Sequence, residues 1–441
     1  MIEEVKKRID QIRHGIVPEG YKKGKLGIVP REWDEIPFST LFTSTSDYTD
    51  NLQKYPLYSL TIEDGITVKT ERYERSHLVK KDNSYKVVRP NDYAYNPMNI
   101  RFGAVARHKG DIPVAVSGYY DIFTTVHKSD LAFMDSFLTC DPMITYYNKA
   151  STGSLIEKQR VHFSDFLEFS LALPPLEERK KIAEILTTQD KAIELERQRI
   201  DEILKVKQFF LGKMFPKKGQ AVPEIRFKGF TGVWEQRKFG EVFDCTVPNN
   251  TLSRAELSYD EGTVLNVHYG DVLIKYDSVL DVQKDDIPRI PHRCREDFNG
   301  ALLQDGDVII ADTAEDETTG KACEIGNLQG SAIVSGLHTM VCRPRNRMAL
   351  GYLGYYLNSN AYHHQLLPLM QGIKVLSLSR SNIQKTSVSY PSAMKEQQLI
   401  ASYFSQLDHL ITLHQRKLEE EKKKKKALMQ LLLTGIVRVS A

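Results

Sequence analysis

The sequence lacks paired cysteines, long apolar runs and a strong excess of either charge. Its five cysteines form no Cys-x-x-Cys pair, which argues against a zinc ribbon and against a disulfide framework. No run of about 18 apolar residues occurs, and the first four residues carry no cleavable apolar core. We therefore expect a soluble, cytoplasmic protein without a metal site.

The charges nearly balance, with 60 Lys and Arg against 57 Asp and Glu and a net charge of +3. Any basic surface for nucleic acid must therefore come from local clustering. Because 41% of the residues are hydrophobic and 27% are charged, close to the average of globular proteins, we expect a folded chain. A length of 441 residues favours roughly two to four domains.

Catalytic motifs are missing as well. Residues 95–98 (Tyr-Asn-Pro-Met) lack the second proline and the aromatic residue of the Asn-Pro-Pro-Tyr motif of adenine methyltransferases. Residues 319–322 (Thr-Gly-Lys-Ala) lack the first glycine and the hydroxyl of a phosphate-binding P-loop. Asp141 has no nuclease-type Glu-x-Lys nearby, and His363 with His364 lack further zinc ligands. The sequence predicts a protein without catalytic residues.

What the sequence contains is an internal repeat. The two tryptophans, Trp33 and Trp234, are followed at the same spacing by similar aromatic and apolar residues. Residues 114–118 (Val-Ala-Val-Ser-Gly) return as 332–336 (Ala-Ile-Val-Ser-Gly). A Glu-Arg-x-x-Ile-Ala segment at 178–183 returns as Glu-Gln-x-x-Ile-Ala at 396–401. Three matches in one order predict a duplicated unit of roughly two hundred residues.

Each unit has a strand-rich part and a helical part. Short apolar runs such as 308–310 and 332–334 alternate with turn signals such as Asp305-Gly306-Asp307, which is typical of a compact domain built mainly from short strands. We predict an α+β fold with boundaries at 1–174 (N-terminal segment and first domain), 175–216 (central helix), 217–391 (second domain) and 392–441 (C-terminal helix).

The two helical parts carry a narrow apolar stripe at alternating three- and four-residue steps, which is typical of a coiled-coil seam. Its members are Ile182, Leu186, Ile193, Ile200, Ile203, Phe210 and Met214 in the first helix, and Ile400, Phe404, Leu407, Ile411, Leu418, Leu428 and Leu432 in the second. Polar residues share the stripe, namely Gln189, Glu196, Lys207, Glu421 and Lys425. We expect the two helices to pair antiparallel, with a pseudo-twofold relation between the repeats.

The two ends of the chain are also alike. Residues 14–17 (His-Gly-Ile-Val) resemble 434–437 (Thr-Gly-Ile-Val). The short helix expected over 2–13 is therefore interpreted as a fragment of the same helical element, placed beside the C-terminus.

The order and duplication of these features resemble the specificity subunit of a type I restriction–modification enzyme over essentially the whole length. The resemblance rests on the lead-ins 17–33 and 226–238, the Ile-Ala helix starts and the Leu-Leu-Thr-Gly ending at 432–435. Two features depart from it. Arg179 stands where the family usually has Gln, and the lysine run 422–426 dilutes the second seam.

The resemblance implies a non-catalytic subunit in which each domain is a target recognition domain that reads one half of a bipartite DNA site. The helices would set the spacer and dock two methyltransferase subunits that use S-adenosylmethionine. Motor–endonuclease subunits would add ATP- and Mg-dependent cleavage. The alternatives are a specificity subunit for a fused methyltransferase–nuclease of another restriction class, and a coiled-coil scaffold without a DNA role.

DNA reading needs Lys and Arg for phosphates and Arg, Asn, His or Tyr for base edges. The candidates in the first domain are Tyr58, Lys69, Arg72, Tyr73, Arg75, Asn99, Arg101, Arg107, Tyr119 and Tyr120. Those in the second domain are His268, Tyr269, Lys275, Tyr276, Arg289, His292, Arg293, Arg295, Lys374 and Arg380. Any single one can instead be an ordinary solvated side chain, and Tyr269 and Tyr276 can instead belong to the core. The lysine run 422–426 suits a phosphate clamp, but it follows three glutamates, so local Glu–Lys pairs on a solvated face are the favoured interpretation.

Overall fold

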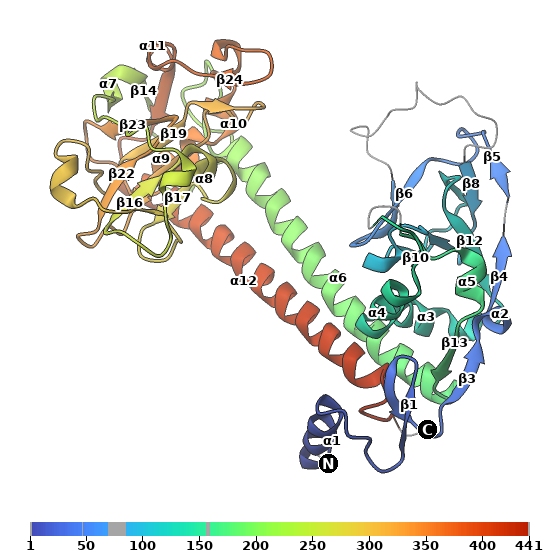
Figure 1. Cartoon of the computed structure of the whole chain (residues 1–441). Coiled ribbons are helices and arrows are strands. Elements are labelled where there is room, and N and C mark those ends of the chain that lie inside the picture. The colour runs from blue at the N-terminus through green and yellow to red at the C-terminus, as the bar shows by residue number, and fades with distance from the viewer. Residues whose placement is uncertain (1, 46, 69–84, 156–158, 440–441) are drawn as a thin grey trace. The chain divides into compact units, whose positions relative to one another are not determined.

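The chain divides into two compact units. The computed structural model describes residues 2–45, 47–68, 85–155 and 159–439 (Figure 1). Unit 1 comprises Met1–Glu196 and Lys417–Ala441, and unit 2 comprises Arg197–Arg416. Each unit contains strands, short helices and part of two long helices, so the α+β class with two strand-rich regions is confirmed. In the described part of the chain, no helix is long and apolar enough to cross a membrane.

Unit 1 is built on an antiparallel four-stranded sheet of order β10-β9-β12-β4, beside a three-stranded sheet of order β11-β8-β5. The strands are β4 (Phe42–Thr45), β5 (Tyr48–Thr49), β8 (Tyr85–Val88), β9 (Tyr93–Tyr95), β10 (Val105–Arg107), β11 (Val114–Ser117) and β12 (Asp121–Thr125). Two hairpins are formed by β1 (Tyr21–Gly24) with β2 (Gly27–Pro30) and by β6 (Tyr58–Thr61) with β7 (Gly65–Val68). A further two-stranded pair consists of β3 (Asp34–Pro37) and β13 (Ser170–Leu173). The helices are α1 (Ile2–Arg13), α2 (Phe38–Leu41), α3 (Leu131–Phe137), α4 (Asp141–Ala150) and α5 (Phe163–Leu167).

Unit 2 is built on a five-stranded sheet of order β15-β23-β19-β21-β17, beside a three-stranded sheet of order β18-β16-β22. The strands are β15 (Phe243–Asp244), β16 (Val264–Val267), β17 (Val279–Asp281), β18 (Arg289–Ile290), β19 (Val308–Ala311), β21 (Ala322–Gly326), β22 (Ala332–Ser335) and β23 (Thr339–Pro344). Two further pairs are β14 (Glu235–Lys238) with β25 (Ser387–Tyr390), and β20 (Thr313–Ala314) with β24 (Leu376–Ser377). The helices are α7 (Phe239–Val242), α8 (Tyr269–Ile274), α9 (Tyr352–Leu357), α10 (Asn360–His363) and α11 (Arg380–Ile383).

The two units share one order of elements. In each, a buried tryptophan precedes a strand, β3 or β14, that pairs with the last strand before a long helix. An aromatic core lies behind that strand. In unit 1 the rings of Phe38 and Phe166 meet edge to face at 5.0 Å, and in unit 2 the rings of Phe215 and Phe404 stack at 5.9 Å. Both cores bury large rings, so each unit has its own hydrophobic support.

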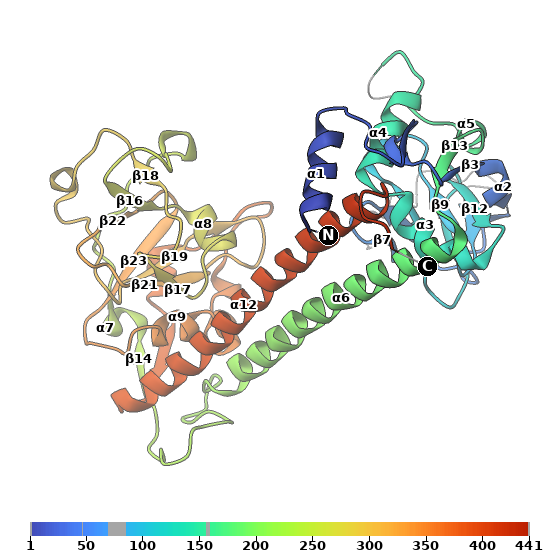
Figure 2. The same cartoon turned by 90° about the horizontal axis from the view of Figure 1, so that it is seen from below.

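The long helices α6 (Leu176–Lys213) and α12 (Met394–Leu432) lie side by side (Figures 1 and 2). In unit 1, Gln189 donates to the carbonyl oxygen of Glu421 at 3.1 Å, and Lys417 pairs with Glu196 at 2.8 Å. In unit 2, Phe210 contacts Tyr403 with ring centroids 5.2 Å apart. Residue numbers rise along α6 as they fall along α12, so the helices run antiparallel in each unit. All fourteen predicted seam residues are buried or half-buried.

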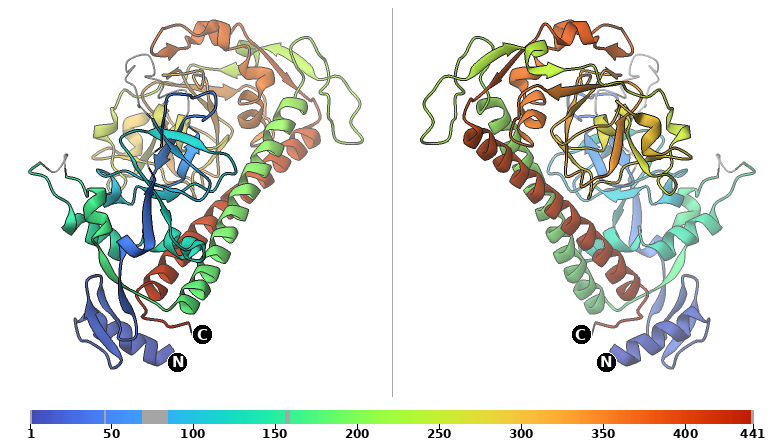
Figure 3. Two further views of the ribbon diagram at one scale, coloured as in Figure 1. Left: turned by 90° about the vertical axis from the view of Figure 1, so that its right-hand side faces the viewer. Right: turned by 90° about the vertical axis from the view of Figure 1, so that its left-hand side faces the viewer.

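In each unit an arginine binds the glutamate near the start of a long helix. In unit 1 the Arg438 guanidinium donates twice to Glu178, at 2.7 and 2.8 Å, and the Trp33 indole donates to the same carboxylate at 3.2 Å. Tyr21 also donates to the Gly435 carbonyl at 2.7 Å, which holds the C-terminal segment beside the N-terminal one (Figure 3). In unit 2 the matching contact is Arg226 with Glu396, at 2.6 and 2.8 Å.

Candidate nucleic-acid interface

The predicted residues of unit 1 fall into three groups. Lys69, Arg72, Tyr73 and Arg75 lie outside the described residues. The other predicted residues lie at the two ends of β9, which pairs with β10 and β12. The end at Tyr95 is next to the residues Asn99, Arg101, Tyr119 and Tyr120. At the end at Tyr93, Arg107 is the strand partner of Tyr93, and the ring of Tyr58 contacts His108.

The first end comprises the loop 96–104 and the turn 117–120, and is here named the Asn99 edge. Asp121 pairs with Tyr95 across β12 and β9, so the turn lies next to the loop. Asn99 and Tyr119 are exposed and Tyr120 is half-buried. Arg101 is buried, and its guanidinium donates to Gln159 at 2.6 Å. Arg101 therefore supports the loop, while Asn99 and Tyr119 face solvent.

The other end is dominated by the carboxylate of Asp135. Arg107 donates to it at 2.9 and 2.7 Å, Lys109 pairs with it at 3.4 Å, and Tyr93 donates to it at 2.8 Å. Burial acts to raise the pKa of Asp135, but the hydrogen bond from Arg107 and the nearby Lys109 charge outweigh it, and this pKa lies below its ordinary value. Arg107 is thus engaged within the fold.

The basic loop 288–295 of unit 2 is anchored at several points. Asn266 donates its backbone N–H to the Pro288 carbonyl at 2.8 Å, and Arg295 donates to the Gly330 carbonyl at 3.1 Å. His292 has a left-handed backbone with φ of 57°. Arg289, His292 and Arg293 are exposed, and none forms an ion pair within the described residues. A fixed backbone therefore presents three basic side chains to solvent.

A second basic cluster of unit 2 centres on Tyr259. Arg254 and Lys275 both lie over the Tyr259 ring, at 5.5 and 4.6 Å from its centroid. Arg254 forms an ion pair with Asp271, and Lys275 pairs with Asp286 at 2.9 Å. Lys275 was among the residues predicted from sequence, whereas Arg254 and Tyr259 were not, because nothing in their spacing shows that they meet.

The remaining predicted residues of unit 2 divide between core and surface. Tyr276 is buried in the core, and burial raises the pKa of its phenol, so the core interpretation applies to it. His268 is also buried and caps α8 by accepting from the Gly270 N–H at 3.2 Å; burial lowers its pKa. Tyr269 is half-buried, whereas Lys374 and Arg380 are exposed.

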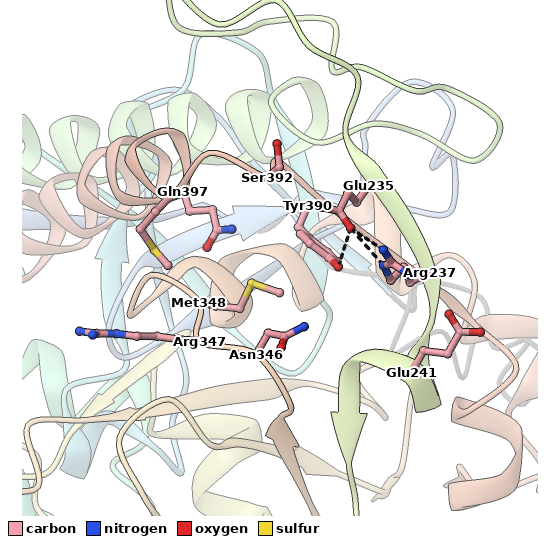
Figure 4. Close-up of a pocket in the computed structure, with 10 residues that line it drawn as sticks. Glu235, Arg237, Glu241, Asn346, Arg347, Met348, Tyr390, Ser392 and Gln397 are labelled. Carbon is pink, nitrogen blue, oxygen red and sulfur yellow. Dashed lines mark hydrogen bonds and ion pairs between the residues drawn. The ribbon is translucent and has the colours of Figure 1, made fainter.

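A polar pocket of about 600 Å³ lies in unit 2 between β14, β25 and the start of α12 (Figure 4). Glu235 accepts from Arg237 at 3.0 Å and from the Tyr390 hydroxyl at 3.2 Å. None of the predicted DNA-binding residues lines this pocket. Within the described ranges, no group of three or more His, Cys, Asp or Glu side chains could hold a metal ion.

The family model for the type I restriction modification DNA specificity domain matches residues 136–205 and 232–422. The chain is 25% identical over 284 residues to the type I restriction enzyme MjaVIII specificity subunit of Methanocaldococcus jannaschii. That match covers 62% of this chain and 63% of that protein, so the chain spans less than two thirds of this relative's length.

Two solved structures share the fold. One is a chain from a study of complex assembly and conformational transition of the type I R-M system, with 16% identity, a TM-score of 0.53 and coverage of 93% of this chain and 99% of that one. The other is the type I restriction–modification S subunit of M. genitalium, with 12% identity, a TM-score of 0.51 and coverage of 91% and 96%. At these identities the likeness concerns the fold alone.

Proposed function

Since the chain belongs to the family of type I restriction–modification DNA specificity domains, we propose that it is the non-catalytic DNA-recognition subunit of such a system. Each unit reads one half of a bipartite DNA site. The observation that carries this proposal is the duplication of one strand-rich plan, joined through α6 and α12, with exposed recognition-type side chains on loops of both units.

In unit 2 the loop 288–295 is the main DNA contact. Arg289 and Arg293 are exposed and have no ion-pair partner among the described residues, so no ion pair with these residues has to break when they bind phosphate or guanine. Tyr259, with Arg254 and Lys275, adds an aromatic surface whose two cations are each paired with an aspartate, and Lys374 and Arg380 add two exposed cations.

In unit 1 the Asn99 edge is the main DNA contact within the described residues. Its exposed Asn99 and Tyr119 can donate to and accept from base edges, while buried Arg101 acts through the loop. Lys69, Arg72, Tyr73 and Arg75 remain predicted contacts outside the described residues.

The helices set the spacer between half-sites and dock two methyltransferase subunits. Support comes from apolar side chains of unit 2 that lie on the helices off the seam and are 40–53% exposed, namely Leu204, Val206, Phe209, Leu410 and Leu413. Large apolar side chains that stay exposed on a helix can contribute to a protein-binding face. The partners supply S-adenosylmethionine-dependent adenine methylation and, in the restriction complex, the ATP- and Mg-dependent motor and endonuclease.

The test combines the chain with its methyltransferase subunit. Methylated adenines are mapped in a host that carries both, and binding to the mapped duplex is measured at several salt concentrations. Replacing Arg289, Arg293 and Arg295 together with Ala should weaken binding and reduce the salt slope by about one for each phosphate that the variant no longer binds. Arg347→Ala, an exposed arginine away from the loop, is the control and should change neither. Unchanged binding of the triple variant would remove this loop from the interface.

A further inference from the structure

The loop at the Asn99 edge is tied by hydrogen bonds and core contacts although it lies at the surface. Asn96 fixes its start, since the Asn96 side-chain oxygen accepts from the backbone N–H of Met98 at 3.1 Å and of Asn99 at 3.3 Å. At the end of the loop, the Ala104 N–H donates to the Asn99 carbonyl at 3.1 Å. Ile100 is fully buried in the core below. A loop tied at its start, its end and its underside holds its outward side chains in fixed positions.

Two of those side chains share one side of a 3-10 turn. The turn η2 (Ile100–Phe102) begins after Asn99, and the Phe102 N–H donates to the Asn99 carbonyl at 2.9 Å. With three residues per turn, residues three apart project from the same side. Asn99 is exposed, and its carboxamide has no hydrogen-bond partner among the described residues. Phe102 is 54% exposed.

The arginine between them in the sequence contacts the phenylalanine ring. The Arg101 guanidinium lies 5.1 Å from the centroid of the Phe102 ring, and it also donates to Gln159 at 2.6 Å and to the Met98 carbonyl at 3.4 Å. A half-exposed aromatic ring that is held in place in this way loses little entropy when it meets a partner.

From this juxtaposition we propose that Asn99 and Phe102 together read A·T base pairs in the half-site of unit 1. Asn99 binds the N6 and N7 edge of an adenine, and Phe102 contacts the C5-methyl group of a thymine. An Asn carboxamide matches the donor–acceptor pair that adenine shows in the major groove, and an apolar side chain matches the methyl group that distinguishes thymine there. This inference rests on the proposed function and adds the chemical identity of bases that one unit reads.

The charge around the Asn99 edge favours DNA over a protein partner. The loop 96–104 contains one arginine and no acidic residue. Asn148 at the end of α4 donates to the Arg101 carbonyl at 2.9 Å, which adds a second neutral amide to this edge. Val161 donates to the Pro97 carbonyl at 3.1 Å, which brings the neighbouring Arg160 close to the loop. Arg160 suits a phosphate that flanks a read base pair.

The test uses the chain in complex with its methyltransferase subunits and duplexes that carry the mapped site. Each thymidine is replaced in turn by 2′-deoxyuridine, which lacks only the methyl group. The wild-type complex should lose about three- to fivefold in affinity at one thymine of one half-site, the effect expected for one buried methyl group. Phe102→Ala should abolish this difference and leave the thymines of the other half-site unaffected. Phe102→Leu should retain it, because leucine keeps an apolar contact.

The adenine contact is tested with 7-deaza-2′-deoxyadenosine, which lacks N7. Replacing the read adenine should weaken wild-type binding about tenfold, and Asn99→Ala should make binding indifferent to the replacement. Ile112→Ala is the matched control, because Ile112 is 57% exposed on another loop of unit 1. It should behave as wild type throughout.

Two results would overturn the inference. One is weaker binding by Phe102→Ala when the half-site that this variant affects contains no A·T pair. The other is equal sensitivity of wild type and Phe102→Ala to deoxyuridine at every position. Reduced methyltransferase binding by Phe102→Ala, with unchanged affinity for DNA, would assign the ring to a protein contact instead. Absence of any sequence-specific binding by the wild-type complex would overturn the proposed function itself.

Discussion

At the scale of single residues, the buried glutamates at the starts of the two long helices are each matched by an arginine. Glu396 is 1% exposed and would be strongly unfavourable in the fold without the two hydrogen bonds from Arg226. Glu178 is held by Arg438 in the same way. The two arginines reach equivalent glutamates from different places in the sequence, one from the segment after α6 and the other from the segment after α12.

Arg226→Ala should lower the free energy of unfolding of unit 2 by about 3–5 kcal/mol, because it leaves a buried carboxylate without its partner. The chain has two tryptophans, so in a Trp33→Phe background the fluorescence of Trp234 reports the urea unfolding of unit 2 alone. Arg237→Ala is the control: it breaks an exposed pair with Glu235 and should change stability by less than about 1 kcal/mol. Equal effects of the two variants would contradict the structural role of Arg226.

Glu324 gives unit 2 a pH dependence of its own. Its side chain is 1% exposed, accepts from the Gly354 N–H at 2.9 Å, and burial raises its pKa to about 7 from 4.5. Between these two values the folded state binds more protons than the unfolded state, so stability from this group falls as pH rises through the window and is constant above it. The loss amounts to about 3 kcal/mol across the whole window.

Glu324→Gln should remove this loss, because the amide keeps the hydrogen-bond acceptor and carries no charge. Measured by the urea midpoint of Trp234 fluorescence from pH 5.5 to 8, the stability of the variant relative to wild type should increase up to about pH 7 and then level off. Parallel profiles for the two proteins would show that Glu324 ionises normally in the fold.

At the scale of elements, the helix pair combines an apolar seam with polar contacts that fix its register. Gln189 bonds to Glu421, and Lys207 forms an ion pair with Asp408, whose other oxygen accepts from Tyr355 at 2.8 Å. A polar contact within a seam disfavours any shift of one helix along the other, because the shift would leave buried polar groups without partners. The seam residues stabilise the pair, and the polar residues determine its alignment.

If α6 and α12 set the spacer of the DNA site, lengthening both should lengthen the spacer. Four residues inserted after Glu196 and four before Lys417, where the two helices form an ion pair, add about 6 Å to each helix and nearly preserve the seam. Because DNA rises 3.4 Å per base pair, the methylated site should gain one or two spacer base pairs with both half-sites unchanged. Methylation mapping reads the result. Activity on the original spacing would leave the helices with a docking role only, and altered half-site bases would place base recognition in the helices.

At the scale of the whole molecule, the chain is two units that each carry a complete core. The core of unit 1 takes Ile182 and Leu186 from α6 and Leu432 from α12, while that of unit 2 takes Met214 from α6 and Ile400 and Phe404 from α12. Each unit therefore holds its own ends of both long helices. Independent cores of this kind allow one strand-rich domain to be replaced without unfolding the other.

Replacing residues 225–391 with the equivalent part of a related specificity subunit should change one half of the methylated sequence and leave the other half intact. Mapped adenine methylation in the host is the measurement, and the parent chain in the same host is the control. A change in both halves would show that the units do not read DNA separately.

The sequence by itself determined the features that depend on local periodicity and on order along the chain. Heptad-like spacing from Ile182 to Met214 is enough to predict α6, because the side chains that share a helix face are fixed by a period of 3.6 residues. The α+β class follows in the same way from the short apolar runs, and the family follows from the duplicated order of motifs around Trp33 and Trp234.

Only the tertiary structure decided which polar side chains are free to act. Arg101, Arg107 and Arg293 were all predicted from the sequence as DNA-binding residues. In the structure Arg101 donates a hydrogen bond to Gln159 and Arg107 donates to Asp135, whereas Arg293 is exposed. The partners of Arg101 and Arg107 lie 58 and 28 residues away along the chain. No local pattern encodes such a contact, because it forms only when separate loops are brought together by the packing of the core. The exposure of Phe102 depends on the same packing, which is why this ring was not among the residues predicted from sequence.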